Sequence, residues 1–95
     1  MPEMCFRIRW PDGTSETCYS PSLVIKDFFA LGESYSLHEF LRLSRAALML
    51  ASQRVETKYG RPCQRALNQL ARLEDTATAF VGNPAASVTV DAFEE

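Results

Sequence analysis

The stretch from Ser36 to Gly60 constrains the fold most, because its pattern predicts one long amphipathic helix. Ser36 and Glu39 have the S-x-x-E spacing of a capping box, in which two side chains bind exposed N–H groups at a helix start. Gly60 suits the end, since a left-handed C-cap favours a residue without Cβ. Between these ends, apolar and small residues recur at helical spacing: Leu37, Phe40, Leu41, Ser44, Ala47, Leu48, Ala51, Val55 and Tyr59.

Leu43, Ala46 and Leu50 widen the apolar face of this predicted helix. The face then covers roughly half of the circumference, whereas an ordinary surface helix has a stripe of ~100°. Such a helix needs cover on two sides. We therefore expect a homodimer that forms through the long helix. The alternative is a monomer in which a short helix over residues 21–30 covers the same flank.

Two strands are predicted near the start of the chain. Residues 4–10 alternate between apolar and polar, as a half-buried strand does. Pro11-Asp12-Gly13 suits a turn, and residues 14–19 return as the second strand of a hairpin. The side of the first strand that faces the core would carry Phe6, Ile8 and Trp10.

The length of the turn sets the pairing of these two strands. A three-residue loop places Phe6 opposite Cys18, whereas a two-residue loop would place Cys5 opposite Cys18. Gly13 at the third loop position suits a bulge and favours the first register. This register turns the carboxylate of Glu16 toward the apolar face.

A short helix is predicted after the hairpin, because Ser20 is a good N-cap and Pro21 is tolerated in a first turn. The alternative is a strand through Leu23-Val24-Ile25, which contains β-branched residues. Residues 33–35 are expected to be a connector into the long helix.

A second long helix is expected from Pro62, at the first helical position, to about Ala79. The short connection predicts that the two long helices form an antiparallel hairpin. The inner face of this second helix would consist of Cys63, Ala66, Leu67, Leu70, Leu73 and Ala77.

Residues 87–93 alternate again and predict a third strand, with Phe93 on the face opposite to Val88, Val90 and Ala92. The element order β-β-α-α-α-β favours an α+β two-layer sandwich. We expect a three-stranded antiparallel sheet of order 2-1-3, packed on the long helical hairpin. The length of 95 residues predicts a single domain over residues 1–95.

Composition restricts the compartment and the chemistry. The start Met1-Pro2-Glu3-Met4 has no basic region followed by an apolar core, and no apolar run is long enough to span a membrane. Cys5, Cys18 and Cys63 lack the C-x-x-C spacing of a metal or redox site. We expect a cytoplasmic protein with reduced thiols, no metal, no cofactor and no membrane contact.

No nucleophile, phosphate-loop or metalloprotease motif is present. We therefore expect no catalytic residue. The alternative is a small enzyme that transforms a ligand in a pocket near Cys63 and His38, with Tyr19 or Tyr35 as a further lining residue.

Charge is distributed unevenly, although the net charge is only −2. Residues 40–73 contain seven basic side chains and one acidic one, and four of the basic residues gather around the junction of the two long helices: Arg54, Lys58, Arg61 and Arg65. These four are the candidate site for an anion or an acidic partner. The simpler alternative is that acids of the sheet, Asp91, Glu94 and Glu95 among them, balance these charges. Nucleic-acid binding through the basic helices is a further alternative, which the negative net charge disfavours.

Three motifs together resemble a family of small bacterial proteins of the nitrogen starvation response. These motifs are Phe6-Arg7-Ile8-Arg9-Trp10-Pro11-Asp12-Gly13, Cys18-Tyr19-Ser20-Pro21-Ser22 and Lys58-Tyr59-Gly60. The genes of that family lie in a conserved cluster with a nitrilase, together with radical-SAM, acetyltransferase, flavoprotein and AIR-synthase-related neighbours. The resemblance implies a role in nitrogen assimilation and carries over no active-site residue. It favours a non-catalytic accessory protein that binds a protein of the same pathway or a small ligand.

Overall fold

The computed structural model of the chain describes residues 3–95; Met1 and Pro2 of the expected domain lie outside the described residues. The helices and strands follow in the order β1 (Met4–Arg9), β2 (Ser15–Ser20), α1 (Ile25–Phe28), β3 (Ser34–Ser36), α2 (Leu37–Tyr59), α3 (Gln64–Ala77), the 3-10 helix η1 (Thr78–Phe80) and β4 (Ser87–Glu94). The α+β class predicted from the sequence is confirmed.

The sheet has four antiparallel strands in the order β2-β1-β4-β3, so the expected three-stranded sheet was wrong in strand number. The antiparallel pairing of the last strand with the first is confirmed. The additional strand is β3, which we expected to be a connector and which pairs with β4, Tyr35 lying opposite Val88. Three residues are too few to show an alternating pattern, and the backbone bonds that fix β3 come from β4, which is distant in the sequence.

The register of the β1–β2 hairpin is the one that a three-residue loop predicts. Phe6 lies opposite Cys18, and Gly13 has a φ of 89° in the turn. Glu16 lies opposite Ile8 on the side of the core, as this register requires. Its Oε1 atom accepts a hydrogen bond of 2.9 Å from the indole N–H of Trp10, which explains how a carboxylate is accommodated there.

The predicted orientation of Phe93 was wrong because β4 contains a bulge. Arg7 lies opposite Ala92 and Ile8 lies opposite Val90, so Asp91 is an additional residue in β4. One additional residue reverses the direction of every side chain that follows it. Phe93 therefore lies opposite Phe6 and packs against the core.

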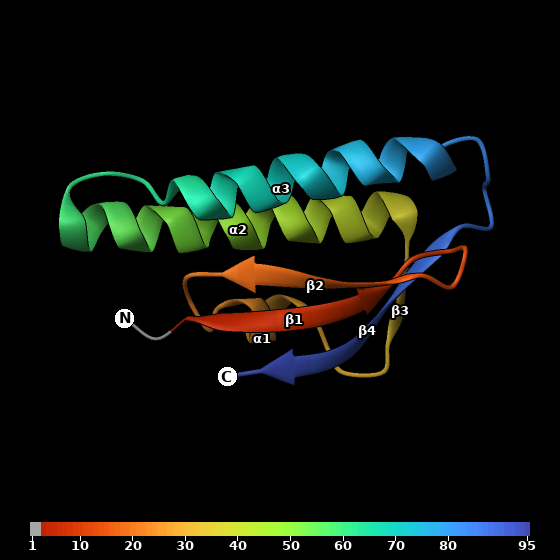
Figure 1. Ribbon diagram of the computed structural model, residues 1–95, viewed down its shortest axis with the longest axis horizontal. Helices are drawn as coiled ribbons and strands as arrows, with labels where there is room; N and C mark the ends of the chain where they lie inside the picture. Colours follow the sequence, from red (N-terminus) through yellow and green to blue (C-terminus); the bar gives the residue numbers. More distant parts are fainter. Residues whose placement is uncertain (1–2) are drawn as a thin grey trace.

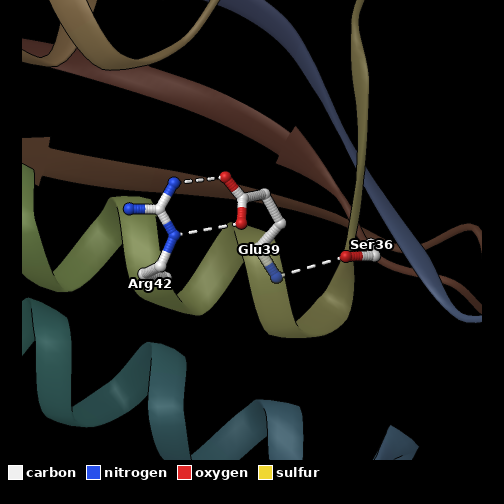
Figure 2. Close-up of polar contacts among 3 residues, drawn as sticks. All are labelled: Ser36, Glu39 and Arg42. Carbon is white, nitrogen blue, oxygen red and sulfur yellow. Dashed lines mark hydrogen bonds and ion pairs between the residues drawn. The ribbon is translucent and has the colours of Figure 1, made fainter.

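The start of α2 matches the prediction, with one difference (Figure 2). The side chain of Ser36 accepts a hydrogen bond of 3.2 Å from the backbone N–H of Glu39. The carboxylate of Glu39 binds the guanidinium of Arg42 through two contacts instead of returning to Ser36, so only half of the capping box forms. The Arg42 hydrogen bond lowers the pKa of Glu39.

The end of α2 also matches the prediction. Gly60 is the left-handed C-cap with a φ of 87°, and its N–H donates to the carbonyl oxygen of Glu56 at 2.8 Å. The absence of Cβ therefore has the expected role at this position.

The other two helices are shorter than expected. Residues 21–24 form turns and α1 spans four residues, so Leu23-Val24-Ile25 leads into a helix and is not a strand. Ser20 ends β2 instead of capping a helix, and its hydroxyl donates to the carbonyl oxygen of Ser22. The start of α3 lies two residues later than predicted, with Cys63 as N-cap, because the Cys63 N–H donates to Ser52 Oγ of α2 at 3.0 Å.

Helices α2 and α3 lie side by side along the sheet as an antiparallel pair (Figure 1). Leu48 of α2 is fully buried in the core, whereas Val55, on the same predicted apolar face of the helix, is only half-buried. Ile25 and Phe29, in and directly after α1, cover the flank of α2, and the ring of Phe29 lies 5.6 Å from that of Phe40. The largest members of the core are Phe6, Ile8, Trp10, Ile25, Phe29, Phe40, Leu48, Leu70, Leu73, Val88 and Val90.

Candidate functional site

The four basic residues chosen from the sequence lie at one end of the helical hairpin, where α2 passes into α3 (Figure 1). Arg54 and Lys58 belong to the last two turns of α2, Arg61 to the connection, and Arg65 to the first turn of α3. All four are exposed. We call this group the basic end of the hairpin.

The acids of the sheet that could have balanced the basic end are paired elsewhere. Asp91 lies 3.5 Å from Arg9, and Glu94 lies 3.7 Å from Arg7. Glu95 binds Lys26 at 2.7 Å. Within residues 3–95, no acidic side chain forms an ion pair with a residue of the basic end. The charge of the basic end is thus not balanced by an ion pair with any of the described residues.

Two residues of the basic end are held in place by the segment that ends β2. The guanidinium of Arg54 donates to the hydroxyl of Ser22 at 3.2 Å. The guanidinium of Arg65 stacks on the ring of Tyr19, with its carbon 3.8 Å from the ring centre. Stacking occupies the flat face of a guanidinium and leaves its N–H groups free to bind a carboxylate in the plane. The ring of Tyr19 therefore orients the guanidinium of Arg65.

Tyr19 has an unusual environment beside Arg65. Partial burial raises the pKa of its phenol to about 12, and the hydrogen bond of 3.1 Å that the phenol donates to Glu3 acts in the same direction. At neutral pH the phenol of Tyr19 is therefore uncharged beside the cationic guanidinium of Arg65.

His38 and Cys63, the two residues that define the alternative enzyme pocket, do not come together. His38 lies in the first turn of α2 and Cys63 follows its end, so the length of the helix, about 33 Å, separates them. The hydroxyl of Tyr35 accepts a hydrogen bond from the N–H of Ala30 at 2.9 Å, and its ring packs against Phe29 with the ring centres 5.3 Å apart. Among the described residues, no three His, Cys, Asp or Glu side chains are placed to hold a metal ion.

Sequence reasoning missed Gln69, a polar residue of α3 that is only 7% exposed. Its Oε1 atom accepts a hydrogen bond of 3.0 Å from the backbone N–H of Tyr19 in β2. A hollow of about 280 Å³ lies beside it, lined by Tyr19, Arg65, Asn68, Gln69 and Arg72. The sequence did contain a signal for this stripe of α3, because Asn68 and Gln69 lie three and four residues from both Arg65 and Arg72.

A family model described as "Nitrogen starvation-induced protein NitG" matches residues 5–93 of the chain. The chain belongs to this NitG family. The comparisons with curated proteins and with solved structures found no match. In the described residues of this NitG-family chain, no helix is both long and apolar enough to cross a membrane. The NitG match includes the whole basic end and the hollow beside α3.

Proposed function

We propose that this NitG-family chain is a non-catalytic binding protein of the nitrogen starvation response, and that the basic end of the hairpin recruits an acidic protein partner. The observation that carries the proposal is the set of four exposed basic side chains that have no acidic partner within residues 3–95. Such a group produces a focused positive potential, which attracts and orients an acidic surface. His38 and Cys63 are too far apart to share a pocket, which favours a binding role over the alternative of a small enzyme.

The proposal places the chain in the cytoplasm, in a nitrogen-assimilation pathway linked to a nitrilase. The resemblance of its motifs to the nitrogen-starvation proteins supports this setting, because the genes of that family lie beside a nitrilase gene. The partner would be a protein encoded in the same cluster. Its contact surface would be acidic, to match Arg54, Lys58, Arg61 and Arg65.

A capture experiment with purified cluster proteins, each tested singly, examines the proposal. A variant in which Arg54, Lys58, Arg61 and Arg65 are all replaced by glutamine should lose capture of one of these proteins, and capture by the unmodified chain should weaken as salt rises. The matched control replaces Arg7, Arg9, Lys26 and Arg45 by glutamine, because it removes the same charge from residues that already have acidic partners. Equal capture by both variants, insensitive to salt, would overturn the proposal. If the variant of the basic end captures every protein normally but loses binding to duplex DNA, the nucleic-acid alternative is favoured.

The exposed face of α2 supports self-association as a second binding role. Met49, at the middle of the helix, is 45% exposed, and it lies beside a groove of about 360 Å³ between α2 and α3. Arg42, Ala46, Gln53 and Glu56 are exposed on the same stripe, at alternating spacings of four and three residues. If two copies of α2 cross antiparallel at Met49, Arg42 of each copy lies near Glu56 of the other. A homodimer through α2 is therefore part of the proposed function.

A further inference from the structure

Strand β2 is the edge of the sheet next to α3, and its backbone polar groups alternate in direction. The N–H of Trp10 donates to the carbonyl oxygen of Thr14 at 2.8 Å, so Trp10 and Thr14 are a hydrogen-bonded pair of the hairpin. Since such pairs alternate in an antiparallel ladder, the N–H and C=O groups of Ser15, Thr17 and Tyr19 point away from β1. These three residues form the free edge of β2.

Only one N–H group of the free edge has a partner in the part of the chain that the structure describes. The Tyr19 N–H donates to Oε1 of Gln69, whereas no hydrogen bond involves the N–H of Ser15 or Thr17, both of which are exposed. The Gln69 amide thus takes the position of the first peptide group of a neighbouring strand. Its Nε2 atom is buried and has no hydrogen-bond acceptor within residues 3–95. A buried donor without a partner is costly.

Basic side chains of α3 lie along this edge. Helix α3 contacts β2, and the two elements run in opposite directions (Figure 1), so Arg65 lies at Tyr19 and Arg72 lies near Glu16. Arg72 is 4.0 Å from the Glu16 carboxylate, and its side chain is 74% exposed. The two arginines are separated by about 10 Å along the helix, which lies between the spacings of ~7 Å and ~14 Å that side chains two and four residues apart have on one face of a strand. Among residues 3–95, no acidic side chain lines the hollow between them.

We propose that the free edge of β2 binds an extended acidic segment of the partner as an additional strand, a mode that rests on the proposed function and specifies how the partner is held. The added strand pairs with the N–H and C=O groups of Ser15 and Thr17. Carboxylates on its α3-facing side bind Arg65 and Arg72. Strand addition of this kind takes affinity from the backbone and specificity from side chains on one face.

The probe for this mode is a synthetic peptide of about eight residues, the length of an ordinary strand, in which glutamate and threonine alternate. Hydrogen exchange measured by NMR should show that the peptide slows exchange of the Ser15 and Thr17 amides at least about tenfold, because both become hydrogen-bonded. The matched peptide with lysine in place of glutamate should leave exchange at both amides unchanged. Equal protection by the two peptides, or no protection by either, would overturn the inference.

Variants separate the edge from the basic end of the hairpin. Thr17→Pro removes an outward N–H and is tolerated on an edge strand, whereas Thr17→Ala keeps the N–H. Affinity for the glutamate peptide should fall at least about fivefold in Thr17→Pro and remain unchanged in Thr17→Ala. If Thr17→Pro fails to fold, the exchange measurement on the unmodified chain decides.

Arg72 belongs to the edge alone and Arg61 to the basic end alone, so these two residues distinguish the two proposals. Arg72→Gln should weaken binding of the glutamate peptide more than Arg61→Gln does. If the peptide perturbs only amides around Arg61, the strand addition is wrong and the proposed function stands. If the peptide protects the edge but the basic-end variant captures every cluster protein normally, the role of the basic end is wrong.

Discussion

Leu48 is a fully buried side chain near the middle of α2, beneath which Phe6, Ile8 and Trp10 of the sheet complete the core. Replacement of Leu48 by alanine should lower the free energy of unfolding by about 2–5 kcal/mol, because the deleted atoms leave a cavity. Chemical denaturation measures this loss. Leu31→Ala is the matched control, since Leu31 is 56% exposed, and it should change stability by less than about 0.5 kcal/mol. Equal effects of the two substitutions would show that Leu48 is not part of the core.

The burial of the Tyr19 phenol can be tested in alkaline solution. Its folded pKa of about 12 lies above the ordinary value of 10.0, so the folded chain holds the phenolic proton more tightly than the unfolded chain does. The stability that this proton contributes is complete below pH 10 and is lost as pH rises through about 12.

Ultraviolet titration of phenolate measures the Tyr19 pKa, with Tyr19→Phe as the reference from which the difference is taken. Tyr19→Phe should also reduce the fall in unfolding free energy between pH 10 and 12. A difference curve with its midpoint near pH 10 would contradict the burial that we assign to this phenol.

Among the elements, α2 shows how a local signal fixes a boundary. Gly60 lies in the left-handed region, and a Cβ built there would meet no atom within 4 Å, so only backbone strain opposes a side chain. Gly60→Ala should therefore destabilise the chain by about 1 kcal/mol. Gly82 has no positive φ and equally open surroundings, so Gly82→Ala should be neutral or slightly stabilising. Thermal unfolding of the two variants makes the comparison, and equal midpoints would contradict the left-handed cap.

For the whole molecule, the decisive property is the number of copies. Sedimentation at micromolar concentration should give a species of twice 10.7 kDa, because the exposed stripe of α2 complements itself about Met49. Met49→Glu should convert it to a single chain, whereas Val81→Glu, at a residue that is 68% exposed outside this stripe, should not.

The charge pattern of the α2 stripe allows a compensation experiment. Arg42→Glu should weaken the dimer through repulsion from Glu56 of the second copy, and a further Glu56→Arg change should restore it. A clean 10.7 kDa species from the unmodified chain would remove the dimer.

The parts of the fold that were predictable depend on residues close together in the chain. Ser36 and Gly60 fix the ends of α2 through backbone groups within a few residues, and the turn at Gly13 fixes the hairpin register. The gathering of the basic end was predictable for the same reason, because the connection between α2 and α3 is short.

Features that depend on contacts between distant segments left no local pattern. Strand β3 exists because β4 lies beside it, and the bulge at Asp91 is defined only by the strand opposite. The hydrogen bond from Tyr19 to Gln69 joins residues 50 positions apart. The same holds for the acids at the end of β4. The sequence supplies their charge, but packing places Arg7, Arg9 and Lys26 beside them, so that within residues 3–95 the basic end has no acidic partner. Periodicity and capping depend on residues close together in the chain, so the sequence alone reveals them. The partner of a long charged side chain depends on how the helices pack on the sheet, so only the tertiary structure decides it.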